Sequence, residues 1–324
     1  MNTPNNKSEL RSSNKNELST FSVPEVLYNN RYCNQDDFNI LICGGRNHGK
    51  PVRNCFLINP FNFSKTKELP SMLEPRYYCQ TVAISSDLFV AGGYSSDGKS
   101  NSIEMFSYKN KAWKNIDFPL NKLYKFCVCS FNKMLYIIGS GIIEDIVQKY
   151  TCCCSVYDVK TGKWSQKAET NAVRTNSSSC TVFEGKIVVT GGIYSCYSVE
   201  AYDHHKSRWS YLPPMIEKRR WHASVSMGNK LFVIGGKKSL SCELFSSRSR
   251  KFVYLKHSLN IQVFHKSFLR SVCIGDKIVV CVMSKYGLGT KICTYDVCKQ
   301  KWLYCDSKFS TKYTAISCTK NPMQ

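Results

Sequence analysis

The stretch RRWHASVSMGNKLFVIGG, residues 219–236, decides the fold because its pattern recurs along the chain. It holds two short strand-like runs, and the second, Leu231 to Ile234, ends in a pair of glycines. Corresponding runs end at Gly45, Gly93, Ser140, Gly192 and Met283. Successive ends lie 48, 47, 52, 44 and 47 residues apart, and a period of this length is typical of repeat architectures.

Each repeat also carries two aromatic residues at a fixed interval of seven positions. The pairs are Phe56 and Phe63, Phe106 and Trp113, Tyr157 and Trp164, Tyr202 and Trp209, Phe245 and Phe252, and Tyr295 and Trp302. Because this interval never varies, it predicts a rigid hairpin. The interval from the glycine end to the first aromatic ranges from 9 to 17 residues, which predicts a surface loop.

These landmarks divide each repeat into four short strands, A to D. A precedes the glycine strand, B is the glycine strand, and C and D carry the two aromatics. Four short strands per period predict a blade of a β-propeller, an all-β fold, and no segment has a sustained amphipathic helical pattern. The first repeat lacks a convincing A strand, whereas the chain ends with one, KYTAISC, at 312–318. We therefore predict six blades over 38–318, with the C-terminal strand completing the first blade, a disordered tail at 1–37 and a short tail at 319–324.

A strand that ends in Gly-Gly and is followed by Tyr and then Trp resembles the kelch repeat, and residues 198–236 are especially similar to the kelch propellers of the BTB–Kelch family. That family serves as substrate adaptors of cullin-based ubiquitin ligases. The resemblance implies a protein-interaction module that recognises substrates for such a ligase. Kelch propellers also resemble actin-binding proteins, which gives a cytoskeletal alternative, and some are copper oxidases, which gives a third, enzymatic one. Residues 1–37 are too short and too polar for the BTB or BACK regions of the family.

The glycine pairs have a nucleotide-binding and a structural interpretation. No G-x-G-x-x-G or G-K-[ST] motif follows any of these strands, and Glu144 stands where a third glycine would be needed after Gly139 and Gly141. We therefore interpret the pairs as strand ends where the backbone closely approaches a neighbouring blade. They are Gly44 and Gly45, Gly92 and Gly93, Gly191 and Gly192, and Gly235 and Gly236.

Large aromatics on the D strands are interpreted in the same structural sense. Large aromatic rings bury much apolar surface, so we expect them to pack between neighbouring blades. The tryptophans concerned are Trp113, Trp164, Trp209 and Trp302.

Composition and motifs argue against several classes of protein. No apolar run approaches the ~20 residues of a membrane span, and the polar N-terminus is not a secretory signal. The 18 cysteines include no C-x-x-C, and the six histidines form no H-x-x-x-H; His204 and His205 are expected in a solvated turn. We expect a cytoplasmic protein that is not an enzyme and has no metal or cofactor, with reduced and mostly buried cysteines.

The positive charge lies in the repeats. The formal net charge is +22, and the first 37 residues carry four basic and five acidic side chains, so the remainder carries +23. A cation stands just before each A strand. These cations are Arg76, Lys125, Arg174, Arg219, Lys266 and Lys312. Because equivalent loops meet on one face of a propeller, we predict that the six ring the mouth of the central channel, with Arg220 and Trp221 beside them.

This predicted ring suggests an acidic or phosphorylated protein segment as partner, since arginine can bind such groups bidentately. The resemblance implies the same face, where BTB–Kelch proteins capture substrates, often with an arginine ahead of strand A; that role carries over best to Arg219 and Arg76. The alternative is that surface cations only keep the scaffold in solution. Nucleic acid is disfavoured, because the cations form no tract with interleaved aromatics and no RRM or KH signature is present.

Overall fold

The computed structural model describes residues 40–59, 62–100, 102–118, 123–142, 150–174, 177–237, 239–259, 267–284, 290–305 and 317–320. The chain divides into two units, Met1–Tyr32 and Cys33–Gln324, and all described residues belong to the second. The predicted tail at 1–37 lies outside the described residues. Every helix or strand element among them is a strand, and none of them belongs to a helix able to span a membrane.

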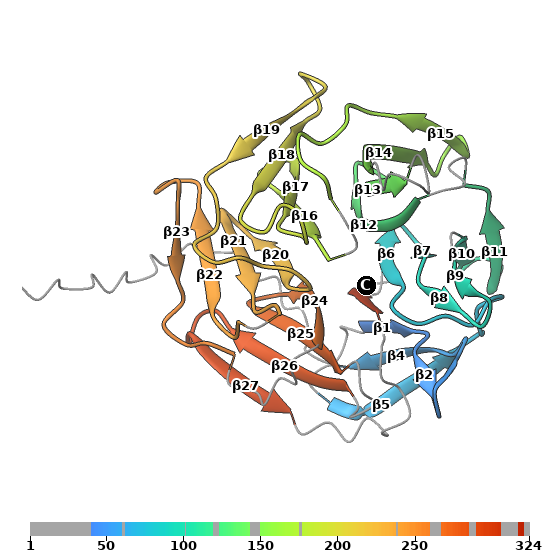
Figure 1. The fold of residues 1–324 in the computed structure, drawn as a ribbon. Coiled ribbons are helices and arrows are strands. Elements are labelled where there is room, and N and C mark those ends of the chain that lie inside the picture. Colours follow the sequence, from blue (N-terminus) through green and yellow to red (C-terminus); the bar gives the residue numbers. More distant parts are fainter. Residues whose placement is uncertain are drawn as a thin grey trace, which may run out of the picture. The chain divides into compact units, whose positions relative to one another are not determined.

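Six four-stranded antiparallel sheets surround a central channel and form a β-propeller, as predicted (Figure 1). In each sheet the strands run in the order A, B, C, D from the channel outward. Blade 1 consists of β28 (Ser317–Lys320), β1 (Ile40–Cys43), β4 (Cys55–Asn59) and β5 (Asn62–Leu69). Blade 2 consists of β6 (Gln80–Ile84), β7 (Asp87–Ala91), β10 (Ile103–Ser107) and β11 (Ala112–Ile116). Blade 3 consists of β12 (Leu123–Phe131), β13 (Met134–Ile142), β14 (Tyr150–Asp158) and β15 (Lys163–Gln166).

The remaining blades follow the same plan. Blade 4 consists of β16 (Ser179–Phe183), β17 (Lys186–Thr190), β18 (Val199–Asp203) and β19 (Arg208–Leu212). Blade 5 consists of β20 (Ala223–Met227), β21 (Lys230–Ile234), β22 (Cys242–Ser246) and β23 (Lys251–Tyr254). Blade 6 consists of β24 (Ser267–Ile274), β25 (Lys277–Ser284), β26 (Thr290–Asp296) and β27 (Lys301–Cys305). Two small hairpins lie in the B–C loops of blades 1 and 2: β2 (Arg46–Asn47) with β3 (Lys50–Pro51), and β8 (Tyr94–Ser95) with β9 (Gly98–Lys99).

The propeller closes through the C-terminal strand. β28 pairs antiparallel with β1, so that Ile42 lies opposite Cys318. The predicted closure is therefore confirmed, and the described strand, Ser317–Lys320, extends into the predicted tail at 319–324, while residues 312–316 lie outside the described residues. Closure removes the unpaired strand edge that an open array would expose at this point.

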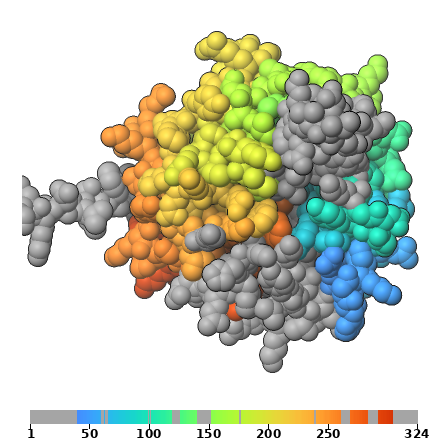
Figure 2. Space-filling model, viewed as in Figure 1, coloured from blue at the N-terminus to red at the C-terminus, as the bar shows by residue number. Residues whose placement is uncertain are grey.

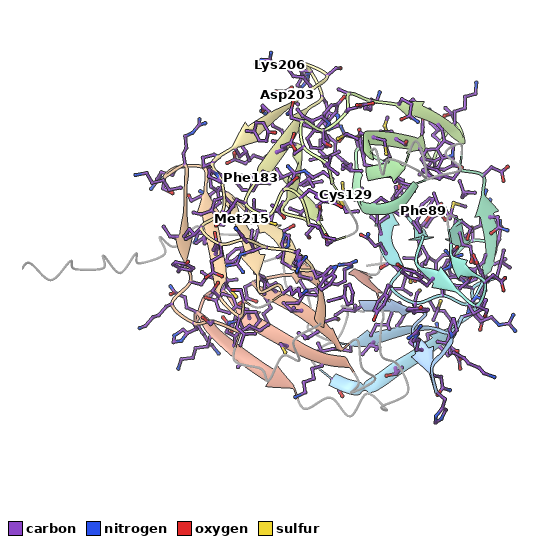
Figure 3. The ribbon with its side chains drawn as sticks, in the orientation of Figure 1. Phe89, Cys129, Phe183, Asp203, Lys206 and Met215 are labelled. Carbon is purple, nitrogen blue, oxygen red and sulfur yellow. The ribbon has the colours of Figure 1, made fainter. Side chains whose placement is uncertain are left out.

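Each blade interface holds one apolar cluster, and the B strands explain why. In β21, Leu231 and Val233 pack toward blade 4, whereas Phe232 and Ile234 pack toward blade 6. Because successive side chains point to opposite faces and both faces are covered, every position must be apolar. Phe183 and Met215 lie in the interface between blades 4 and 5, while Asp203 and Lys206 lie at the outer rim (Figure 3).

The predicted C–D hairpin occurs in all six blades, and in five of them the two aromatics lie opposite each other. The two aromatics are cross-strand partners on C and D, as for Tyr202 and Trp209. In blade 1 the register shifts between Ile58 and Asn59, so Phe56 lies opposite Glu68 and not opposite Phe63. The constant interval in the sequence therefore does not correspond to a constant register in that blade.

Each D-strand tryptophan binds the preceding blade. Its indole Nε1 donates to a backbone carbonyl just past the previous D strand: Trp113 to Pro70 at 2.8 Å, Trp164 to Asp117 at 2.6 Å, Trp209 to Ala168 at 2.8 Å and Trp302 to His257 at 3.1 Å. Trp113 and Trp209 are buried, whereas Trp164 and Trp302 are only partly buried. Figure 2 shows the yellow and orange segments of blades 4 and 5 packed against each other at the surface.

The glycine pairs lie where one blade meets the loop of the next. A Cβ on Gly191, which has a φ of +55°, would lie 2.4 Å from the carbonyl oxygen of Arg219. The amide of Gly192 donates to that same oxygen at 3.0 Å. Only glycine combines the left-handed backbone with such a close approach.

The structure describes the side chains of fifteen cysteines; nine of them are buried, and all fifteen are free thiols. Burial raises the pKa of Cys79 to about 12, so its thiol stays protonated at neutral pH. They pack as small apolar side chains, in line with the expectation from sequence.

Candidate functional site at the channel mouth

Three arginines of the predicted ring do not face the mouth. Arg76, Arg174 and Arg219 are each 0% exposed and rank among the largest fully buried side chains. The expectation that they attract a partner from solvent is therefore wrong for these three residues. A buried arginine keeps its charge and needs an internal counter-ion, and each of them has one.

Arg219 shows how this charge is compensated. Its Nε and Nη2 lie 2.8 and 2.7 Å from Oε1 of Glu243, which is also fully buried. Nη1 donates to the carbonyl oxygens of Gly235 at 2.6 Å and Ser241 at 2.8 Å. The guanidinium thus ties the loop between blades 4 and 5 to the B–C loop and C strand of blade 5.

The carboxylate of Glu243 also binds backbone amides of the same loop. Glu243 accepts hydrogen bonds from the amides of Ile216 at 2.7 Å and Glu217 at 3.1 Å. This arrangement recurs in blade 2 with Arg76 and Glu104 and in blade 4 with Arg174 and Glu200. We call these three pairs the arginine–glutamate clamps. Together with the glycine contact at the Arg219 carbonyl, a clamp fixes a D–A loop between two blades.

The sequence contains a signal for the clamps that the pattern of cations before strand A does not show by itself. In blades 2, 4 and 5 a glutamate stands two residues before the C-strand aromatic, and the cation before strand A is arginine. In blades 1, 3 and 6 that position is Asn54, Ser155 or Cys293, and the cation is lysine. The glutamate and the arginine occur together, which would have predicted a buried pair.

The position of the three lysines of the predicted ring at the channel mouth stays a prediction. Lys125 belongs to β12, where its backbone lies opposite Ser140, but its side chain lies outside the described residues. Lys266 and Lys312 lie outside the described residues altogether.

Aromatic rings gather at the mouth instead. We call five partly exposed residues the mouth cluster: Tyr77, Tyr78, Tyr94, Trp221 and Phe268. The ring of Phe268 lies 4.4 Å from that of Tyr78 and 4.9 Å from that of Trp221, and Tyr77 stacks on Tyr94 at 5.4 Å, all between centroids. These residues come from blades 2, 5 and 6 or from the loops that lead into them. Phe268 of blade 6 contacts both Trp221, before blade 5, and Tyr78, before blade 2, although blade 1 lies between blades 6 and 2 in the ring.

Two members of the cluster adopt an unfavourable backbone conformation at equivalent positions. Tyr78 and Trp221 each have a φ of +57° and each follow a clamp arginine by two residues. Bulky side chains rarely adopt this left-handed conformation, which costs about 1–3 kcal/mol and is enriched at binding sites. The clamps supply the rigid framework that holds both residues in place.

Cations flank these rings. The guanidinium of Arg46 lies 3.7 Å from the centroid of Tyr77, and Arg220 and Lys237 lie 5.4 and 5.2 Å from that of Trp221. Of the predicted site residues, Arg220 and Trp221 are thus partly exposed and adjacent. Burial raises the pKa of Tyr78 to about 12, so its phenol remains uncharged at neutral pH, and the surface combines aromatic rings with cations.

A polar pocket lies in the channel among the inner ends of the blades. It is lined by residues of β6, β12, β16, β20 and β24 and by the residue before β16: Gln80, Thr81, Val128, Ser178, Ser179, Cys180, Ser224, Arg270 and Ser271. Hydroxyl groups dominate this wall, and Arg270 is its single charged side chain among the described residues.

Neither described histidine that lies near the core is placed for acid–base work in solvent. His222 is fully buried, with Nε2 2.7 Å from Oγ1 of Thr190, and burial, followed by Arg219, lowers its pKa to about 3. His204 was expected in a solvated turn, but its ring stacks on Phe131 at 4.5 Å between centroids and is partly buried.

One group of side chains has ligand-like spacing for a metal. The ligand atoms of Asp276, Asp296 and Cys298 lie within 4.8 Å of one another. Lys277 already pairs with Asp276 at 3.1 Å, and burial, together with both aspartates, raises the pKa of the Cys298 thiol. A protonated thiol beside an ammonium group is a poor metal site, so we assign no metal to it.

Comparison with known proteins agrees with the repeat pattern and the propeller. The family model for the KLHDC2/KLHL20/DRC7 Kelch-repeats domain matches residues 31–236. Kelch-like protein 38 of Rattus norvegicus is 28% identical over 182 residues, which are 55% of this chain and 30% of that protein. Kelch-like protein 23 of Homo sapiens is 25% identical over 207 residues, which are 61% of this chain and 35% of that protein.

The matched part covers about a third of these relatives' own length. The relationships support a kelch module for protein–protein interaction. The match to the family model spans more than half of the chain, and the blades carry the kelch landmarks in their expected places. The chain belongs to the Kelch-repeat family.

Proposed function

We propose that the chain recognises an acidic segment of a partner protein at the channel mouth. The observation that carries this proposal is the mouth cluster with its flanking cations, in which Tyr78 and Trp221 are held in a left-handed conformation. Partly exposed aromatics beside arginine are typical of the residues that dominate protein interfaces. Carboxylates on the partner complement Arg46, Arg220 and Lys237, and an apolar side chain next to them covers the rings.

The biological role follows from the family. Kelch-like relatives support an interaction module, and we propose that this one selects substrates for a cullin-type ubiquitin ligase in the cytoplasm. Binding and positioning suffice for this role, and no enzymatic step is assigned to the chain. The cytoskeletal alternative rests on the acidity of actin, which complements the net charge of +22.

The test is affinity purification from a cytosolic extract with the full chain, followed by mass spectrometry. A mouth variant carries Arg46→Glu, Arg220→Glu and Lys237→Glu. A matched rim variant carries Lys160→Glu, Lys206→Glu and Lys251→Glu, which change the net charge equally. These three lysines are exposed and lie in or next to C–D turns, at the opposite end of the strands from the mouth.

An acidic partner recovered with the wild type and the rim variant, but lost from the mouth variant, supports the proposal. Cullin subunits in the same sample support the ligase role, whereas recovery of actin favours the cytoskeletal alternative. Equal recovery by all three proteins contradicts the assignment of the mouth. Displacement of the partner by random duplex DNA would identify a nucleic-acid surface instead.

A further inference from the structure

We propose that the central channel holds a binding site for a tetrahedral oxyanion of the phosphate type, centred on Arg270. This site is separate from the mouth cluster and does not rest on the function proposed above. It lies in the pocket formed by the inner strands of blades 2 to 6.

The first argument is the chemistry of the wall. Ser179 and the side-chain amide of Gln80 offer donors, whereas the hydroxyls of Ser178, Ser224 and Ser271 already donate within the wall, and no carboxylate is among the described residues that line the pocket. Arg270 supplies a positive charge, and its Nη1 donates to the carbonyl oxygen of Leu269 at 3.0 Å, which fixes the guanidinium near the wall. Arginine with surrounding hydroxyls is a combination suited to phosphate oxygens.

The second argument is the orientation of a serine pair between blades 4 and 5. Oγ of Ser179 accepts hydrogen bonds from the amide of Ser224 at 2.9 Å and from its hydroxyl at 2.8 Å. A hydroxyl has one donor and two acceptor lone pairs, so both acceptors of Ser179 are used and its O–H is left to donate. An anion in the pocket provides the acceptor for that proton.

The third argument is space and potential. The pocket has a volume of about 70 Å³, several times the roughly 10–15 Å³ that one water molecule requires in the same measure. A small ion of five heavy atoms therefore fits. The charge of Arg270 also acts on the neighbouring blade, because after burial and Arg219 it contributes to the lowered pKa of His222, the residue before β20. A positive potential confined by low-dielectric walls attracts an anion.

The same chemistry could be supplied by a free anion or by the phosphate of a phosphorylated side chain. Inorganic phosphate is therefore the first probe, titrated by calorimetry into the full chain at an ionic strength held constant with sodium chloride. We expect saturable binding that weakens at least about tenfold in Arg270→Gln, because the charge-assisted bonds are lost. The matched control Arg248→Gln removes an exposed cation from the C–D turn of blade 5 and should leave binding unchanged.

Two further variants keep the test decisive if Arg270→Gln fails to fold. Arg270→Lys retains the charge without the planar fork, and Ser179→Ala removes one hydroxyl donor; each should weaken binding severalfold. A phosphoserine tripeptide that binds more tightly than inorganic phosphate identifies a phosphorylated side chain as the source, and one that does not bind identifies the free anion. Absence of saturable phosphate binding to the wild type, or equal binding by all variants, overturns the proposal.

Discussion

Blades 4 and 5 differ from blades 3 and 6 in how their ends near the mouth are held. In blades 4 and 5 the A, B and C strands are five residues long, and the B strand ends in a glycine pair beside a clamp. In blades 3 and 6 the same strands are seven to nine residues long and continue past that point. The ends of the blades near the mouth thus carry either a buried ion pair, in blades 4 and 5, or additional strand pairing, in blades 3 and 6.

The comparison shows that the cation before strand A does not have the same role in every blade. Where a glutamate precedes the C-strand aromatic, the cation is a buried arginine that supports the loop. Where Ser155 or Cys293 stands instead, the cation is a lysine, and the C strand is longer. The clamped blades then carry the strained Tyr78 and Trp221, and the unclamped blade 6 contributes Phe268 from its longer β24.

The largest expected effect comes from breaking a clamp. Glu243→Ala leaves the buried charge of Arg219 without its counter-ion and two loop amides without their acceptor. We expect the free energy of unfolding to fall by about 5 kcal/mol, at the upper end for such sites. Chemical denaturation measures this loss. The matched change in an unclamped blade, Ser155→Ala, should cost only about 1 kcal/mol, and equal losses in both blades would contradict the distinction.

Removing a blade-to-blade tryptophan should have the next largest effect. Trp209→Ala deletes a buried ring and its bond to the Ala168 carbonyl, and we expect a loss of about 3–5 kcal/mol in unfolding free energy. Trp209→Phe should cost about 1 kcal/mol, because blade 5 already uses Phe252 at the equivalent position. An unchanged melting temperature in Trp209→Ala would falsify the role given to this ring.

The glycine pairs predict a smaller difference between blades. Gly191→Ala places a Cβ against the Arg219 carbonyl at a φ of +55° and should cost about 2–3 kcal/mol. Gly139 lies within β13, and its φ is not positive. Gly139→Ala should therefore change the denaturation midpoint much less, and a loss as large as that of Gly191→Ala would show that blade 3 has the same close approach.

The smallest effect near neutral pH is a pH dependence from His222, which lies between the clamps of blades 4 and 5. Its folded pKa of about 3 is below the ordinary value of 6.5, so below pH 6.5 the unfolded chain binds a proton that the folded chain does not. Stability is therefore complete above pH 6.5 and falls by about 1.4 kcal/mol per pH unit toward pH 3. His222→Gln should flatten this slope between pH 6.5 and 5, and an unaltered slope would assign the loss to other groups.

The fold could be predicted from sequence because its landmarks are local. The glycine strand and the seven-residue aromatic interval each belong to one hairpin, and the period then places six such hairpins around a ring. The register of blade 1 could not be predicted, because the shift after Ile58 leaves the spacing of Phe56 and Phe63 unchanged.

The candidate site was predicted only in part for a related reason. The position of the D–A loops on the mouth follows from topology, and Arg220 and Trp221 are partly exposed on one of these loops, where their role in binding stays a prediction. Burial of Arg219 depends on Glu243, which is 24 residues away, so a pattern of charges read one loop at a time cannot separate a buried cation from an exposed one. The contact of Tyr78 with Phe268 joins the first and last parts of the propeller and has no local signature.

The most direct test of the account is partner recovery by Trp221→Asn beside Tyr211→Ala. Asparagine tolerates a φ of +57°, so the first change removes the mouth ring while it keeps the backbone. Tyr211 is 58% exposed on the outer strand of blade 4 and serves as the control for the loss of a surface aromatic. We predict that Trp221→Asn loses the acidic partner at an unchanged melting temperature while Tyr211→Ala retains it. Retention of the partner by Trp221→Asn would contradict the claim that the mouth cluster is the recognition surface.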